Sequence, residues 1–338
     1  MRRPVWIAGL AAALLVAALA AGACGTQKID GMAAADVVAK SNAAMQGVQS
    51  AVIDGSLMVT VNGDEDKVTG PASALLLGAP IGMTMTGAVS QHPAAMDMTI
   101  KIPLLATVSP GAETIEERVI GDRLYLRVRD QWYGMKQPAT KSPAPSPSPS
   151  VSTEQVLGAL KRMGIDMDAW VKDKQDLNVE QLDGKDVYHV SEELDVDAIA
   201  DGVAKLLSNA GSLQQLVPSE QNEASQQQLD VLKAQSGRIA ESLKKYLKGA
   251  TVDLWIEKGS FYLDKMAFSA DIDLPQEAAQ QGMSGAEVAL TVGLSKFNEP
   301  VQVEKPKNVK PLATALPGMW ATDGAGAGGL LPGASPSL

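Results

Sequence analysis

The chain has 338 residues, 45% of them hydrophobic and 20% charged, a balance typical of a globular protein with a sizeable core. Its 29 basic and 39 acidic residues give a net charge of -10, which opposes binding to nucleic acid. One cysteine and two histidines exclude an internal disulfide and a zinc cluster of cysteine and histidine ligands. We therefore expect no metal site and no cofactor.

The N-terminus has the features of an export signal. Two arginines precede an apolar run over 5–21, and small residues lead directly to Cys24. We expect 1–23 to be a lipoprotein signal peptide and Cys24 to carry the lipid, although Ala21 stands where such signals usually have Leu. The triplet Ala-Gly-Ala at 21–23 also fits ordinary secretory cleavage at the same bond. Lipidation is favoured because the single cysteine of the chain stands where a lipoprotein needs it, and it would anchor the protein at the extracytoplasmic face of the cell membrane.

Composition divides the mature chain into three parts. Residues 24–31 form a short polar tether, and 32–312 are predicted to be one domain. Within that domain 138–150 alternate proline with small residues, which predicts an extended loop that packs against nothing. Residues 313–338 are rich in Gly, Ala, Pro and Ser and are predicted to be a disordered tail.

The domain starts with a predicted amphipathic helix over 33–49, where apolar residues recur at helical spacing. From about residue 50 to 136 the pattern changes to alternation of apolar and polar side chains, which is typical of half-buried strands. Clear examples are the residues Met98, Ile100 and Ile102, and the residues Leu124, Leu126 and Val128.

Turn residues indicate that these strands form antiparallel hairpins. Short turns are predicted at Gly-Asp 121–122, Asp-Gly 183–184 and Lys-Gly 258–259, between runs of alternating residues. Loops this short cannot make parallel crossovers, so we expect one large antiparallel sheet.

Helical segments interrupt the strands in the middle of the chain. A capping-box pattern, Ser-Thr-Glu-Gln at 152–155, precedes one helix, and a third helical stripe runs over 223–248. Between them a second stripe contains Ile199, Val203 and Leu206. Strands, then helices, then strands again predict an α+β fold.

Catalytic and metal-binding patterns are weak. The glycine pattern at 324–329 lies in the tail rather than between a strand and a helix. The acidic run 64–66 reads as a solvated hairpin tip rather than a cation site, and His92 and His189 read as structural. Glu116 and Glu117 are adjacent carboxylates, but no third group accompanies them that would suggest catalysis by a pair of carboxylates. We therefore expect no catalytic residue and no enzymatic activity.

Three arginines follow the turn at 121–122. Arg123, Arg127 and Arg129 alternate along a strand, and two interpretations of them are open. A solvated outer face is favoured, and a site for an anionic lipid headgroup is the alternative.

Several landmarks together resemble the actinobacterial LppX/LprG-type lipoproteins. They are a signal ending at Cys24 and the segments VIGDRLYL at 119–126, LDGKDVYHV at 182–190, VDLWI at 252–256 and FNEPV at 297–301. The resemblance implies a large curved antiparallel sheet, or half-barrel, with helices packed on its concave face. It also implies an apolar cavity that holds the acyl chains of lipids or glycolipids.

Alternation along the strands indicates which residues would face such a cavity. The sheet wall would contain Leu124, Leu126, Val128, Leu254 and Ile256. The helical stripes, with Ile199, Val203 and Leu206 and with Leu229, Leu232 and Ile239, are candidates for the opposite wall.

The sequence therefore predicts a membrane-anchored extracytoplasmic lipoprotein that binds or carries lipid or glycolipid acyl chains without catalysis. The alternative is a non-catalytic interaction or sensory lipoprotein that presents loops to an envelope partner such as a membrane protein. A solid core would favour this alternative, and an apolar cavity would favour lipid binding.

Overall fold

The computed structural model describes residues 28–67, 77, 80–108, 111, 113–136, 158, 160–166, 168–209, 223–280 and 282–312. The predicted signal peptide, Cys24, the 138–150 loop, the 152–155 capping box and the 313–338 tail lie outside these residues.

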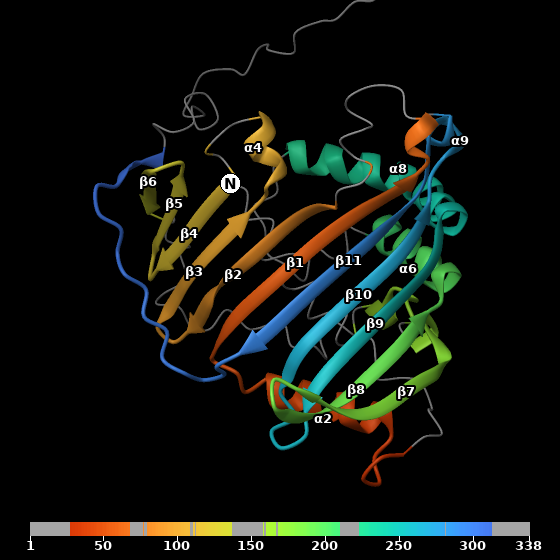
Figure 1. The fold of residues 1–338 in the computed structure, drawn as a ribbon, viewed down its shortest axis with the longest axis horizontal. Helices are drawn as coiled ribbons and strands as arrows, with labels where there is room; N and C mark the ends of the chain where they lie inside the picture. The colour runs from red at the N-terminus through yellow and green to blue at the C-terminus, as the bar shows by residue number, and fades with distance from the viewer. Residues whose placement is uncertain are drawn as a thin grey trace, which may run out of the picture.

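The strands of the described residues form one 12-stranded sheet, in the order β12-β6-β5-β4-β3-β2-β1-β11-β10-β9-β8-β7 (Figure 1). In chain order, the first six strands are β1 (Ser50–Gly63), β2 (Ile81–Gln91), β3 (Ala94–Lys101), β4 (Thr114–Ile120), β5 (Arg123–Val128) and β6 (Gln131–Lys136). The others are β7 (Val171–Leu182), β8 (Lys185–Leu194), β9 (Leu247–Glu257), β10 (Leu263–Asp273), β11 (Met283–Ser295) and β12 (Lys310–Pro311). Neighbours pair antiparallel except β12, which pairs parallel with β6. The predicted α+β fold with a large antiparallel sheet is confirmed, with this one parallel pair as the exception.

The longer helices lie behind the sheet in the view of Figure 1, two of them packed together and the third apart from them at the lower end of the sheet. They are α2 (Ala34–Met45), α6 (Val196–Ser208) and α8 (Glu223–Tyr246), and the sheet curves around them. Shorter helical turns are α4 (Leu104–Val108), α9 (Gln276–Ala279), η2 (Glu65–Lys67) and η3 (Asp168–Trp170). All three long helices fall within the helical segments that periodicity predicts.

Local chemistry explains where these elements begin and turn. Asp195 caps α6, because its side chain accepts a hydrogen bond of 2.9 Å from the backbone N–H of Ala198. Asp183 and Gly184 both have positive φ, 52° and 79°, which is the conformation that a two-residue turn between β7 and β8 requires. The connection from β9 to β10 is longer than the predicted pair at 258–259, since β10 begins only at Leu263.

The compact hydrophobic core lies at one end of the sheet. Side chains from α2 and from β7 to β10 form it, and Ile199 of α6 packs against it. Its buried members include Val37, Val38, Leu177, Val190, Val252, Leu254, Ile256 and Met266. Among the described residues, this cluster contains no side chain of β2 to β6. The apolar side chains of those strands therefore have other surroundings.

Candidate functional site

One face of the sheet is apolar along its whole width. Directly paired residues of antiparallel strands point to the same face, so the pairing register identifies its members. From β5 to β7, one row of paired residues consists of Val128, Ile115, Ile100, Met85, Gly55, Val292, Met266, Leu254, Val190 and Leu177. We call this the inner face, because α2 packs against its β7–β10 part.

The register places both predicted sets of sheet residues on the inner face, but in different surroundings. Leu254 and Ile256 are fully buried in the core, at 1% and 0% exposure. Leu124 and Leu126 are half-buried, and Val128 is 42% exposed. Any ligand on this face would therefore reach the β5 residues, while protein side chains already cover the β9 residues.

The predicted helical residues lie on α6 and α8. Ile199 packs against the core, whereas Val203 and Leu206 are half-buried on α6, which packs against α8. The closest packing of α6 is at Gly202, where an added Cβ would lie 2.3 Å from the Trp170 ring. On α8 the side chain of Ile239 is half-buried, and the side chains of Leu229 and Leu232 lie outside the described part of the structure.

The inner face of β1 to β5 is apolar and incompletely covered. Its half-buried side chains are Leu57, Val59, Ile81, Met83, Met85, Ile100, Ile115, Val119, Leu124 and Leu126. Two of them are methionines, whose flexible side chains adapt to irregular apolar partners. This half of the inner face is the candidate binding surface.

Glu117 lies in the middle of this surface. It pairs with Met98 of β3 and Leu126 of β5, and it is only 6% exposed. Its Oε1 is buried without a hydrogen-bond partner, and burial raises the pKa of the carboxyl from 4.5 to about 7. The sequence singles out Glu117 only as the neighbour of Glu116 in a carboxylate pair, although the alternation of Ile115, Glu117 and Val119 already places it on the apolar face.

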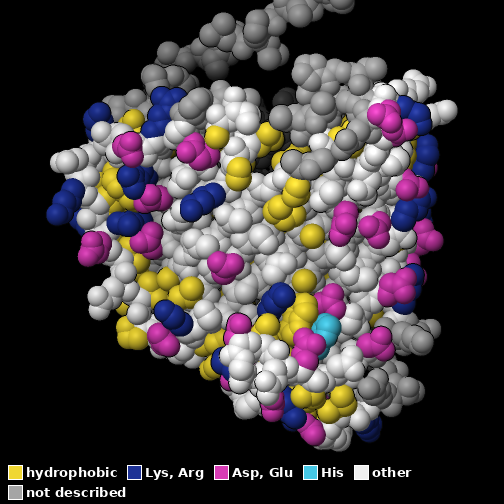
Figure 2. Space-filling model, in the orientation of Figure 1, with side chains coloured by type: hydrophobic (Ala, Val, Ile, Leu, Met, Phe, Trp, Pro, Cys, Tyr) yellow, Lys and Arg dark blue, Asp and Glu magenta, His cyan; other side chains and the backbone are white. Residues whose placement is uncertain are grey.

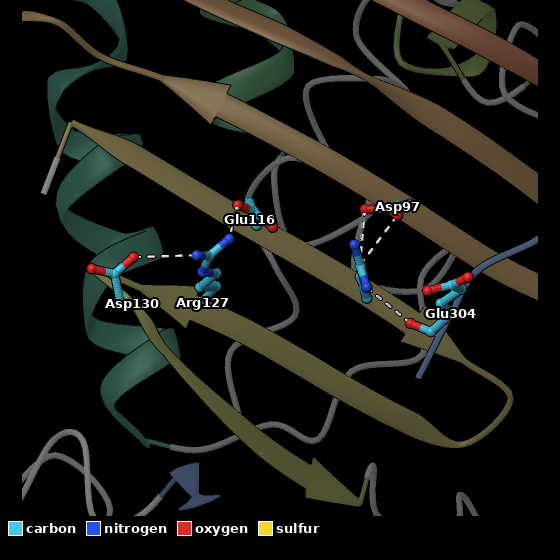
Figure 3. Close-up of polar contacts among 6 residues, drawn as sticks. Asp97, Glu116, Arg127, Asp130 and Glu304 are labelled. Atoms are coloured by element: carbon cyan, nitrogen blue, oxygen red, sulfur yellow. Dashed lines mark hydrogen bonds and ion pairs between the residues drawn. The ribbon is translucent and has the colours of Figure 1, made fainter. Parts of the chain in front are cut away.

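The opposite, outer face carries charged side chains spread over the strands (Figure 2). Arg118 contacts Asp97, with 3.1 Å between Nε and Oδ2, and donates a hydrogen bond of 3.0 Å to the backbone oxygen of Glu304. Arg127 forms ion pairs of 2.7 Å with Glu116 and 3.2 Å with Asp130 (Figure 3).

These contacts decide between the two interpretations of the arginine row. The guanidinium of Arg127 is already paired with acidic groups of the protein. Arg129 lies beyond the end of β5, with a φ of 54°, so it does not continue the strand. The contacts favour the solvated outer face over an anionic headgroup site.

The remaining polar candidates have structural contacts. His189 stacks on Trp255 with 4.6 Å between ring centroids, and its Nε2 lies 2.9 Å from Oδ1 of Asp253. Asp64 pairs with Lys67 across the turn that follows β1. Among the described residues no three Asp, Glu, His or Cys side chains could together hold a metal ion. No helix within the described ranges has the length and apolarity needed to cross a bilayer.

No family model and no curated protein matches the chain. Among solved structures the chain is similar to the crystal structure of LprF from Mycobacterium bovis, at 13% identity and a TM-score of 0.35, over 80% of this chain and 95% of that chain. A weaker similarity, at 11% identity and a TM-score of 0.10, is to GphF dehydratase 1, over 72% of this chain and 76% of that chain.

LprF is an LppX/LprG-family lipoprotein.

Proposed function

We propose that this protein is a non-catalytic lipoprotein of the extracytoplasmic membrane face that binds the acyl chains of a lipid or glycolipid on its inner face. The observation that supports this is the inner face of β1 to β5, which is apolar, lies outside the compact core and leaves many of its side chains only half-buried. An apolar sheet face of this width is normally covered by protein, and an incompletely covered one is typical of a binding surface.

The energetics of acyl-chain burial suit such a surface. Each methylene transferred from water contributes about 0.8 kcal/mol, so part of two acyl chains outweighs the cost of ordering the ligand. Hydrophobic burial needs no polar chemistry from the protein. Burial of acyl chains therefore accounts for an inner face of β1 to β5 that consists mainly of Leu, Ile, Val and Met side chains.

A binding experiment with a matched pair of variants tests this proposal. The full chain carrying Cys24→Ala keeps the Ala-Gly-Ala cleavage site and lacks the thiol that would be lipidated, so bound lipid is not confused with an anchor. We expect mass spectrometry to find co-purified lipid and a fluorescent fatty acid to bind saturably. In this background Ile115→Thr places a hydroxyl on the inner face, and Ile120→Thr places one on the outer face of the same strand.

Ile115→Thr should weaken fatty-acid binding severalfold because the desolvated hydroxyl gains no partner, and Ile120→Thr should leave it unchanged. Both isoleucines are half-buried, so their effects on stability should be similar. Absence of saturable binding to the parent chain would favour the interaction or sensory lipoprotein instead.

Membrane attachment is tested separately. Cys24→Ser removes the thiol that a diacylglycerol thioether requires, so the protein should move from the detergent phase to the aqueous phase or stay unprocessed. Phase partition and intact mass measure this. Unchanged partition together with an unchanged mass would contradict lipidation at Cys24.

A further inference from the structure

A single ionisable side chain lies on the inner face among the described residues of β1 to β5. This is Glu117, and its surroundings are apolar on every side that the register defines. Met98 and Leu126 are its direct partners on the neighbouring strands, and Ile115 and Val119 flank it on β4. The next residue in the row after Met98 is Gly87, where an added Cβ would lie 2.5 Å from the Met98 sulfur. On its other side the row continues past Leu126 to Tyr133 of β6, so the two strands that adjoin β4 offer the carboxyl no polar neighbour.

An unpaired buried carboxyl is costly. A buried acceptor without a hydrogen bond destabilises the folded protein, and a charged one destabilises it more. Oε1 of Glu117 is in this position. With a pKa of about 7, the group is protonated in a large fraction of molecules near neutral pH, and a protonated carboxyl both donates and accepts a hydrogen bond. A ligand that supplied a hydrogen-bonding partner here would remove the cost.

The charges around this position restrict what the partner can be. The inner face of β1 to β5 carries no Lys or Arg in the described part of the chain. The arginines of β4 and β5 that flank the site in sequence, Arg118 and Arg127, are held on the outer face by acidic groups. A phosphate or sulfate headgroup would therefore meet a carboxyl with no countercharge in an apolar environment, which is unfavourable. An uncharged hydroxyl meets no such penalty and can pair with either protonation state.

We propose that Glu117 is a hydrogen-bonding site for a hydroxyl group of a neutral lipid bound on the inner face. The protein then selects lipids with a free hydroxyl, such as an acylglycerol or the sugar of a glycolipid, over fully acylated and anionic lipids. This inference rests on the proposed function, and it adds the chemical class of the lipid. A site that pairs with a ligand hydroxyl discriminates against analogues without it, because its own polar group is then left unpaired.

Competition binding tests this selection with chemically matched lipids. The full chain carrying Cys24→Ala binds a fluorescent fatty acid, which is displaced by 1,2-dioleoylglycerol, its 3-acetyl ester, a monogalactosyl dioleoylglycerol or dioleoyl phosphatidic acid. We expect a free-hydroxyl lipid to displace the probe at roughly one tenth of the concentration needed for the acetyl ester. A preference for the diacylglycerol points to the glycerol hydroxyl, and a preference for the galactolipid alone points to a sugar hydroxyl.

Three variants separate the role of Glu117 from a general effect on the face. Glu117→Leu should abolish the preference while the acetyl ester still displaces the probe as it does from the parent. Glu117→Gln, whose amide also donates and accepts, should retain the preference. Glu116→Gln is the matched control, because Glu116 is the adjacent carboxylate on the outer face, paired with Arg127, and its loss should leave the preference unchanged.

The outcomes distinguish this inference from the function on which it rests. Equal displacement by the diacylglycerol, the galactolipid and the acetyl ester, tightest displacement by phosphatidic acid, or a preference that survives in Glu117→Leu would overturn the hydroxyl site alone. Failure of the parent chain to bind the fatty acid at all would overturn the proposed function.

Discussion

At the scale of single residues, the two carboxylates of β4 illustrate how one step along a strand changes the chemistry of a side chain. Glu116 lies on the outer face and pairs with Arg127, with 2.7 Å between Oε1 and Nη1. Glu117 lies on the inner face, where burial raises its pKa to about 7. Because side chains alternate between faces, the same residue type serves as an ion-pair partner at one position and as a buried weak acid at the next.

The raised pKa makes a prediction about stability. An acid whose pKa is higher in the folded state than in the unfolded state binds its proton more tightly when folded, so folding loses stability as the pH rises. For Glu117 the loss begins near pH 4.5 and is complete above about pH 7, and it amounts to at most about 3 kcal/mol. Glu117→Gln does not titrate, so this variant should be more stable than the parent at pH 8.

Thermal unfolding of the two proteins at pH 4.5 and pH 8 measures this effect, and the low pH serves as the internal control. The difference in melting temperature between Glu117→Gln and the parent should increase by several degrees from the lower to the higher pH. A difference independent of pH would mean that the Glu117 carboxyl is solvated or paired in the folded protein.

At the scale of elements, local patterns predict the helices and strands better than they predict how these meet. The helical stripe over 223–248 corresponds to α8, and the Asp-Gly pair at 183–184 makes the predicted turn with both residues at positive φ. These signals are local because periodicity and turn conformation depend on neighbouring residues. The pairing of β1 with β11 joins segments far apart in the chain, and no local pattern specifies it.

The candidate site shows the same limit. Alternation correctly places Leu126 and Leu254 on one face, but it cannot tell that Leu254 is buried in the core while Leu126 is only half-buried. That difference depends on where α2 packs, which is a long-range property. Likewise, the glycine at 202 carries no sequence signal for the Trp170 ring that lies against it.

The contact between α6 and Trp170 gives a prediction for two glycines in helices. Gly202→Ala should destabilise the protein by about 1 to 3 kcal/mol, because the new Cβ would overlap the Trp170 ring. Gly237→Ala on α8 is the matched control, since an added Cβ there meets nothing within 4 Å. It should stabilise the protein by about 0.5 to 1 kcal/mol through helix propensity alone.

Chemical denaturation of both glycine variants measures the two free energies of unfolding. Opposite signs would confirm that packing at Gly202 outweighs helix propensity. Stabilisation by both substitutions would mean that α6 does not lie against Trp170 in solution.

At the scale of the whole molecule, the sheet divides into two halves with different packing. The β7–β10 half is sealed by α2 and contains the fully buried core. The β1–β5 half continues the same apolar face, where Ile53, Met98 and Glu117 are buried but most other side chains are only half-buried. A fold with one closed half and one incompletely covered half combines stability with a surface that a ligand can reach, because the sealed half does not depend on ligand for its packing.

This division makes the last prediction, which compares one substitution in the two halves. Leu254→Trp adds a large ring to a closely packed position and should destabilise the protein by about 1 to 3 kcal/mol or more. Leu126→Trp adds the same ring to a half-buried position beside Glu117, so it should change stability little. The ring at position 126 would occupy space on the inner face and should weaken fatty-acid binding severalfold.

Thermal unfolding and fluorescent fatty-acid titration of the two tryptophan variants, both in the Cys24→Ala background, measure these effects. Strong destabilisation by Leu126→Trp would mean that the β1–β5 half is as closely packed as the core. Near-normal stability with unchanged binding would place the ligand elsewhere on the molecule. Near-normal stability with weaker binding is the combination that an incompletely covered apolar face requires, because only there can an added ring be accommodated by the protein and still exclude a lipid chain.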